Sequence, residues 1–275
     1  MSETFTERLR SLQRDKQTAL CVGLDPDPER LPDALSEMEP LKAAQEFCLD
    51  IIEATAPFAC AFKFNLAFFE ALGDGGLRVL REVIGAVPED ALTIGDAKRG
   101  DIGNSARFYA RALFDDLSVD ACTVAPYMGR DAVTPFLQRR GTAAFVLART
   151  SNPGADDLQT CTIDGEALYQ RVGRLTREWA SETPADAGLV VGATRPDAVA
   201  RLRELCPALP FLIPGVGAQG GSLKSCLELG TTGEGTVIIN SSRSIIYASE
   251  EGDYAEAAAQ EAERLQQEMK YYLAE

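Results

Sequence analysis

The chain has 275 residues, of which 45% are hydrophobic and 25% charged, so a disordered, collagen-like or coiled-coil protein is excluded. It contains no histidine, which excludes Ser-His-Asp and Cys-His catalytic groups and histidine-ligated metals; proton transfer must use Lys, Asp, Glu, Tyr or Cys. The formal net charge of −15 argues against a nucleic-acid partner, and no apolar run approaches the roughly 18 residues of a membrane span.

The cysteines indicate a reducing compartment. They are odd in number and never spaced as CxxC, and most lie in apolar surroundings that are typical of reduced core thiols. The N-terminal segment is polar and helix-like, unlike a signal peptide. We therefore expect a soluble, cytoplasmic protein. The seven residues are Cys21, Cys48, Cys60, Cys122, Cys161, Cys206 and Cys226.

Short apolar runs recur along the chain after a first predicted helix at about 4–14. Each run is followed by a turn rich in Gly, Asp, Asn or Ser and then by a stretch with helical periodicity. The runs are β-branched or continuously apolar, as expected for strands buried on both faces. They lie at 18–25, 58–65, 91–96, 119–126, 142–150, 187–193, 210–215 and 236–241.

Amphipathic segments separate these runs. Eight strands that alternate with eight helices predict parallel βαβ units and, most simply, an α/β fold of the (β/α)8 TIM-barrel type. The whole chain, 1–275, is then one catalytic domain, with the extra N-terminal helix across the amino-terminal end of the barrel. An open doubly wound sheet is the alternative, although no GxGxxG turn is present. The segments lie at 41–55, 77–84, 104–117, 130–138, 165–182, 196–205, 222–229 and 253–272.

Ionisable residues stand at the predicted carboxyl ends of successive strands, where the active site of a (β/α)8 barrel lies. The densest group is Asp96, Lys98 and Asp101. Residues two apart in a strand face the same side, so Asp96 and Lys98 are expected to point into the barrel mouth together. Lys63 and Asp25 can join them from neighbouring strands. The alternative is a structural ring of ion pairs that closes the barrel.

A second group of residues is typical of a phosphate site. The Gly-rich segment 214–221 leaves backbone N–H groups at a helix start, and Arg243 follows Ser241 and Ser242 at the last strand end. The alternative is that the glycines only form turns. The longer segment 215–235 is a candidate lid.

Six strings of residues resemble the orotidine 5′-phosphate decarboxylase family, specifically its longer bacterial and archaeal branch. They occur in family order over about residues 18–248. The DxKxxD string alone is shared with other sugar-phosphate barrels, whereas the six together are specific. They are VGLDP (22–26), FKFN (62–65), DAKRGDIG (96–103), TSNPG (150–154), PGVGAQGG (214–221) and SSR (241–243).

The resemblance implies decarboxylation of orotidine 5′-phosphate to UMP and CO2, the last step of de novo pyrimidine nucleotide synthesis, without a metal or organic cofactor. It implies that Lys98 protonates C6 of the pyrimidine and that Asp96 lies against the substrate carboxylate. Lys63 would bridge Asp96 and the ribose, Asp25 would hold a ribose hydroxyl, and Ser151 would contact the pyrimidine edge.

The resemblance also implies phosphate binding by Gln219 and Arg243. It implies a homodimer in which Asp101 and Ile102 cross the interface into the neighbouring site. The hydroxyl residue four positions after Asp101 is often Thr in the family and is Ser105 here, which keeps a hydrogen bond but loses a methyl group.

Two other functions remain open on the sequence. One is a metal-dependent sugar-phosphate lyase or aldolase that shares the DxKxxD barrel, for which a magnesium requirement would be diagnostic. The other is a nucleotide-binding sensor that has lost catalysis, which would bind UMP without converting orotidine 5′-phosphate.

Overall fold

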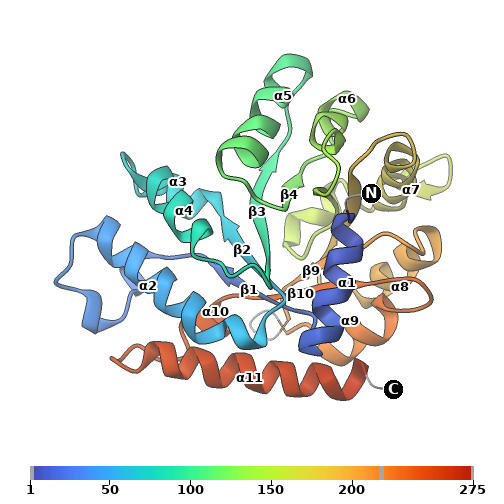
Figure 1. Cartoon of the computed structure of the whole chain (residues 1–275). Coiled ribbons are helices and arrows are strands. Elements are labelled where there is room, and N and C mark those ends of the chain that lie inside the picture. Colours follow the sequence, from blue (N-terminus) through green and yellow to red (C-terminus); the bar gives the residue numbers. More distant parts are fainter. Residues whose placement is uncertain (1–2, 217–219, 274–275) are drawn as a thin grey trace. The chain divides into compact units, whose positions relative to one another are not determined.

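The computed structural model describes residues 3–216 and 220–273. Eight strands close into a parallel barrel in the order β1-β10-β9-β8-β5-β4-β3-β2, with helices between them along the chain (Figure 1). The predicted (β/α)8 barrel is confirmed, and the open sheet is wrong. The barrel strands are β1 (Leu20–Leu24), β2 (Ala61–Asn65), β3 (Leu92–Arg99), β4 (Ala121–Val124), β5 (Ala143–Arg149), β8 (Asp186–Val191), β9 (Phe211–Pro214) and β10 (Val237–Ser241).

The chain divides into two compact units. Unit 1 consists of Met1–Arg10 and Lys98–Ile239, and unit 2 of Ser11–Ala97 and Asn240–Glu275. The boundaries fall inside the N-terminal helix α1 (Phe5–Lys16), β3 and β10. The assignment of the whole chain to a single domain stays a prediction.

The strand register in unit 2 aligns the polar strand ends. Gly23 of β1 pairs with Lys63 of β2, and Asn65 of β2 pairs with Asp96 of β3. The residues that precede these ends are buried and mostly apolar, as expected for strands covered on both faces. The register therefore places the predicted catalytic residues of β2 and β3 at one edge.

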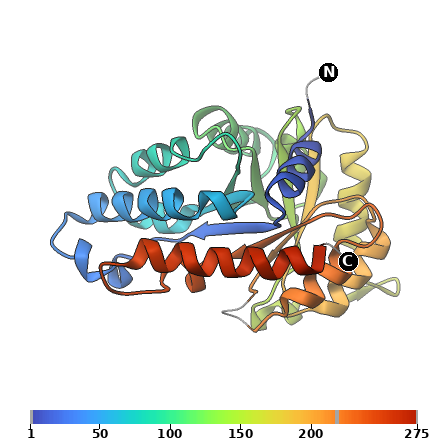
Figure 2. The ribbon, with the colours of Figure 1, turned by 60° about the horizontal axis from the view of Figure 1, so that its bottom comes forward.

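Helices α2 and α11 cover unit 2 side by side (Figures 1 and 2). Phe47 of α2 packs its ring 5.7 Å from Tyr247 and 5.6 Å from Tyr254, measured between ring centroids. These contacts join the helix after β1 to the chain after β10. The helices of this unit are α2 (Pro40–Thr55), α3 (Leu66–Ala71), α4 (Gly76–Gly85), α10 (Arg243–Ile246) and α11 (Tyr254–Leu273).

The remaining helices follow the prediction closely. The predicted N-terminal helix is present as α1 (Phe5–Lys16). In unit 1, the predicted helix at 104–117 is α5 continued by a π-helical turn, and the short α6 continues as a 3₁₀ turn. The helices of unit 1 are α5 (Gly103–Arg111), α6 (Arg130–Val133), α7 (Leu168–Ala180), α8 (Pro196–Leu205) and α9 (Leu223–Gly230).

The helix predicted at 165–182 starts three residues late because a hairpin precedes it. Strands β6 (Thr162–Ile163) and β7 (Glu166–Ala167) pair antiparallel around Asp164 and Gly165. Both turn residues have positive φ, 54° and 81°, as a two-residue hairpin turn requires. The Asp-Gly pair was the sequence signal for this turn. Helices α3 and α10 were also not predicted.

Candidate active site

The carboxyl ends of the unit 2 strands hold one buried cluster of charges. The Nζ atom of Lys63 lies 3.1 Å from Oδ2 of Asp96 and 3.9 Å from Oδ1 of Asp25. Lys63 is only 4% exposed. Three residues predicted from separate strands therefore form one ion-pair array.

The two carboxylates keep the ammonium of Lys63 charged. Burial alone would lower the pKa of Lys63, because an ion loses hydration. The attraction of Asp96 and then Asp25 outweighs burial and holds this pKa above its ordinary value of 10.5. The cluster therefore presents a fixed positive charge between two acids.

Contacts from the chain after β10 position Asp25. The Ser242 hydroxyl lies 2.5 Å from Oδ2 of Asp25. Tyr247 accepts a hydrogen bond from the Asp27 backbone N–H at 2.8 Å and donates one to the Asp25 carbonyl at 3.1 Å. A Cβ on Gly23 would lie 2.8 Å from that of Ser242, so this approach requires glycine. Oδ1 of Asp25 is buried without a hydrogen bond from any described residue.

Lys98 occupies a strained position at the end of β3. Its φ is +46°, in the left-handed region that non-glycine residues rarely adopt. Its backbone N–H donates to the Thr123 hydroxyl of β4 at 2.9 Å, and the residue is exposed. The positive φ interrupts the side-chain alternation from which we expected Asp96 and Lys98 to share a face. Strain of this kind persists at functional sites, where surrounding structure maintains it.

The other residues of the DxKxxD region stand at the start of α5. The Asp101 carboxylate accepts a hydrogen bond from the Ile102 backbone N–H at 2.7 Å. Ile102 is 57% exposed, and Ser105 is exposed on the first turn. These three residues belong to unit 1, with Lys98.

Ser151 lies in the turn after β5, also in unit 1. It is partly buried, and a Cβ on Gly192 would lie 3.0 Å from its Cβ. The turn is held by side chains on both sides of Ser151, including a Thr150 hydroxyl that donates to Oδ1 of Asn152 at 2.6 Å.

The predicted phosphate residues fall on two segments. Gly215 has a φ of +96°, and Val216 forms a bridge with Gly221 just before α9. Gln219 lies outside the described residues. Arg243 is exposed and begins α10 directly after Ser242. The segment proposed as a lid, 215–235, contains the whole of α9.

Comparisons with known proteins identify the family of this chain. Residues 18–259 match the model of the Orotidine 5′-phosphate decarboxylase / HUMPS family. This chain belongs to that family. A protein named orotidine 5′-phosphate decarboxylase from Dehalococcoides mccartyi is 44% identical over 273 residues, 98% of each chain. Another of that name from Cupriavidus metallidurans is 46% identical over 258 residues, 93% of each chain.

A solved structure of a family member gives the same fold. The OMP decarboxylase of Leishmania donovani superposes with a TM-score of 0.81 at 38% identity, covering 96% of this chain and 99% of its own. Because the match covers nearly the full length of both chains, this chain and the Leishmania protein share the whole barrel fold.

The described part of this decarboxylase-family chain contains neither a candidate metal site nor a candidate membrane-spanning helix. Within residues 3–216 and 220–273, no group of three or more His, Cys, Asp or Glu side chains could hold a metal ion. None of the helices in these ranges is long and apolar enough to cross a membrane.

Sequence reasoning missed the residues that support the cluster. Thr123 fixes the backbone of Lys98, and Ser242 and Tyr247 fix Asp25. Ser242 stands in the SSR string, which was a usable signal. Tyr247 lies 220 residues from Asp27, and nothing local marks the contact.

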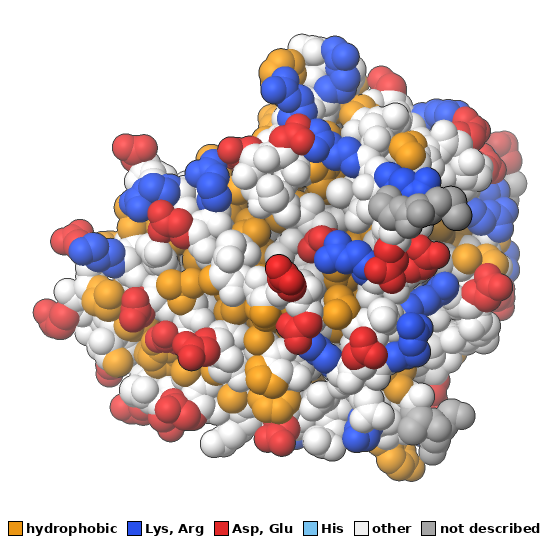
Figure 3. All heavy atoms as spheres, viewed as in Figure 1, with side chains coloured by type: hydrophobic (Ala, Val, Ile, Leu, Met, Phe, Trp, Pro, Cys, Tyr) orange, Lys and Arg blue, Asp and Glu red, His pale blue; other side chains and the backbone are white. Residues whose placement is uncertain are grey.

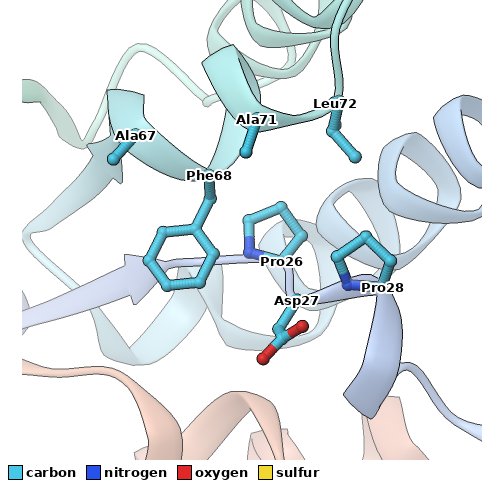
Figure 4. Close-up of a pocket in the computed structure, with 7 residues that line it drawn as sticks. All are labelled: Pro26, Asp27, Pro28, Ala67, Phe68, Ala71 and Leu72. Carbon is cyan, nitrogen blue, oxygen red and sulfur yellow. The ribbon is translucent and has the colours of Figure 1, made fainter.

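Unit 2 also contains an apolar pocket of about 340 Å³ (Figure 4). It lies between the turn after β1 and α3, and Phe68 of α3 lies beside Pro26. None of the predicted site residues lines this pocket. Its lining is mostly apolar, so the pocket is unsuited to the phosphate or the carboxylate of a nucleotide substrate. Its lining residues are Pro26, Asp27, Pro28, Ala67, Phe68, Ala71 and Leu72.

Proposed function

We propose that this protein converts orotidine 5′-phosphate to UMP and CO2 in the cytoplasm, as the last step of de novo pyrimidine nucleotide synthesis. The observation that carries the proposal is the buried Asp25–Lys63–Asp96 array, followed two residues later on β3 by Lys98. The names of the relatives support the same reaction. Seven free thiols, six of them buried, support a reducing compartment.

Lys98 is the proposed proton donor. When the bond between C6 and the carboxylate breaks, CO2 leaves and the electron pair stays on C6. The ammonium of Lys98 stabilises this negative charge, transfers a proton to C6 and is then reprotonated from water. A preorganised charge of this kind is an effective catalytic device because it needs no reorganisation during the reaction.

The array orients the substrate around the reacting carbon. Asp96 lies against the substrate carboxylate, and Lys63 holds Asp96 in place while contacting the ribose. Oδ1 of Asp25 supports a role as acceptor for a ribose hydroxyl, because it is buried and receives no hydrogen bond from a described residue. A donor from the substrate removes the cost of that unsatisfied oxygen.

Ser151 contacts the pyrimidine edge, while Gln219 and Arg243 bind the phosphate. The phosphate lies far from C6, but the free energy of binding it can be used to stabilise the transition state and so raise kcat/KM. Arg243→Ala is expected to lower kcat/KM by more than about a hundredfold, roughly 3 kcal/mol. Arg201→Ala, at an exposed arginine of α8, is the matched control. A change below twofold for Arg243→Ala would refute the phosphate assignment.

The protein acts as a homodimer in which Asp101 and Ile102 enter the partner's site, with Ser105 beside them. The support is an exposed apolar surface in unit 1, of a kind that marks protein contacts. Figure 3 shows hydrophobic and basic side chains together over α5. The exposed apolar residues are Ile102, Phe108, Tyr109, Tyr127 and Met128.

Subunit mixing tests the shared site. Asp101→Ala and Lys98→Ala homodimers are each expected to be inactive. A mixed dimer contains one site with both native residues, so random mixing restores about a quarter of the wild-type activity. No recovery after confirmed subunit exchange would contradict the sharing of Asp101.

The reaction needs no cofactor, and this separates it from the metal-dependent sugar-phosphate lyase or aldolase. The deciding experiment follows the loss of orotidine 5′-phosphate absorbance with EDTA present. Wild-type turnover that EDTA does not change supports the decarboxylase. Loss of all turnover in EDTA and its return with magnesium would favour the lyase, and UMP binding without turnover would favour a sensor.

The same assay tests the proton donor. Lys98→Ala is expected to reduce kcat/KM by many orders of magnitude, because the charge and the proton are both removed. Lys42→Ala, at an exposed lysine of α2, is the matched control and is expected to match wild type. A fully active Lys98→Ala protein would show that another group supplies the proton.

A further inference from the structure

We propose that Gln159 is a positioning residue that fixes the Ser151 hydroxyl for recognition of the pyrimidine. The inference rests on the proposed role of Ser151 and extends it to a residue outside every string that resembles the family. All the contacts involved lie in unit 1.

The Gln159 side chain bonds the residue before Ser151 twice. Its Oε1 accepts the Thr150 backbone N–H at 2.8 Å, and its Nε2 donates to the Thr150 hydroxyl at 2.8 Å. The hydroxyl of Thr150 then donates to Oδ1 of Asn152 at 2.6 Å. One continuous set of hydrogen bonds thus joins the residues on both sides of Ser151.

A buried cation sets the direction of every bond in this set. Arg149, 4% exposed at the end of β5, donates from Nη1 to Oε1 of Gln159 at 3.3 Å and also pairs with Asp156. Arginine has donors only, so the oxygen of Gln159 must face it and the amide N–H must face Thr150. Thr150 must therefore donate onward to Asn152.

The backbone of Gln159 is itself anchored. Its N–H donates to the Ala155 carbonyl at 2.9 Å, and its carbonyl accepts from the Tyr169 N–H of α7 at 3.0 Å. On the opposite side of the turn, the Gly192 N–H donates to the Arg149 carbonyl at 2.7 Å. Gln159 therefore links the turn that carries Ser151 to β5 and α7 through hydrogen bonds. These bonds hold the turn in one conformation, as a preorganised site requires.

A double-mutant cycle in kcat/KM tests the inference. Gln159→Leu keeps the bulk but removes these bonds, and we expect it to lower kcat/KM for orotidine 5′-phosphate about tenfold in the wild-type background. In the Ser151→Ala background the same change is expected to cost less than about twofold, because no hydroxyl remains to be positioned. Gln138→Leu, at an exposed glutamine whose amide donates to the Thr134 carbonyl, is the matched control.

A purely structural role gives a different result. An equal loss of kcat/KM in both backgrounds would overturn the inference, because Gln159 would then act independently of Ser151. Should Gln159→Leu lower the unfolding temperature enough to prevent assay, Thr150→Val breaks the same set at its centre and is expected to show the same dependence on Ser151.

The cycle also separates this inference from the proposed function. A Ser151→Ala protein with wild-type kcat/KM, beside an inactive Lys98→Ala protein, would overturn the role of Ser151 and of Gln159 but not the decarboxylase. No turnover by the wild-type protein would overturn the decarboxylase itself.

Discussion

Two buried cations, Lys63 in unit 2 and Arg203 in unit 1, are satisfied in different ways. Lys63 of unit 2 lies between Asp96 and Asp25, beside a buried carboxylate oxygen that receives no hydrogen bond from the described residues. Arg203 of unit 1 forms no ion pair with a carboxylate of the described residues and donates instead to five backbone carbonyls. These belong to Cys206, Pro207, Leu209, Gly230 and Thr236.

The two environments have opposite effects on pKa. The carboxylates hold the pKa of Lys63 above its ordinary value despite burial, whereas burial lowers the pKa of Arg203 to about 10. The guanidinium of Arg203 also lies 3.7 Å from the Phe211 ring centroid. A buried cation whose donors all end on backbone carbonyls holds elements together. A buried cation among acids with an unsatisfied acceptor is suited to bind a ligand.

Within this comparison, the largest expected effect on activity comes from removing Lys63, the cation that lies among acids. Lys63→Met leaves Asp25 and Asp96 without their partner, and kcat/KM should fall by at least about a thousandfold, roughly 4 kcal/mol. Steady-state assay of folded protein measures it. Activity within tenfold of wild type would contradict a role for this charge in binding.

The stability contribution of Lys63 depends on pH with a definite sign. Its pKa is raised in the folded protein, so the ammonium stabilises the fold below pH 10.5, and this contribution is lost as pH rises toward the folded value. The difference in unfolding free energy between wild type and Lys63→Met should therefore be constant from pH 6 to pH 9, about 3 kcal/mol, and shrink above 10.5. Denaturant titration at several pH values checks this.

Arg203→Leu should lower the stability of the protein but leave its activity nearly unchanged. The loss of the hydrogen bonds from Arg203 to these buried carbonyls lowers stability by about 3 kcal/mol, while kcat/KM of the folded fraction stays within about twofold. Denaturant unfolding and active-site titration measure the two quantities. A stable but inactive Arg203→Leu protein would show that carbonyl-held cations also serve the reaction.

The sequence predicted the fold because each barrel strand is a short apolar run that ends in a polar residue. The same property placed Asp25, Lys63 and Asp96 at one edge, since parallel strands in register bring their carboxyl ends together. These predictions need only local patterns and the rules for parallel sheets.

The missed features depend on contacts between distant residues or on local strain. The positive φ of Lys98 departs from strand alternation, and no side-chain pattern encodes it. Arg203 reads as one more charged position on an amphipathic helix, yet its guanidinium bonds carbonyls up to 33 residues away. The Asp164-Gly165 pair is a recognisable turn signal. The hairpin around it was nevertheless missed, because the helical periodicity that follows led us to predict a helix from residue 165.

A smaller loss of kcat/KM is expected when a side chain is added at Gly23, which lies close to Ser242. Gly23→Ala places a Cβ 2.8 Å from that of Ser242 and 3.1 Å from Oδ1 of Asn240, which forces Ser242 away from Asp25. We expect kcat/KM to fall between about ten- and a hundredfold. Gly85→Ala is the control, because a Cβ there meets nothing within 4 Å. Equal activity for the two variants would show that Ser242 does not position Asp25.

The smallest effect isolates a single hydroxyl. Tyr247→Phe keeps the ring that stacks on Phe47 but removes the two hydrogen bonds to the backbone of Asp25 and Asp27. Because one partly buried N–H loses its acceptor and one carbonyl its donor, we expect kcat/KM to fall about fivefold. The loss should be greatest in KM, since the Asp25 carboxylate remains present but less well oriented toward the ribose.

Tyr254→Phe is the matched control for that change. Tyr254 packs at a tilt against the same Phe47 ring, and its hydroxyl donates to Asp50 on α2 rather than bonding the turn after β1. It should therefore lower the unfolding temperature without changing KM. If both variants raise KM equally, the effect comes from the shared aromatic packing, and the hydroxyl of Tyr247 has no separate part in holding Asp25 beside Lys63.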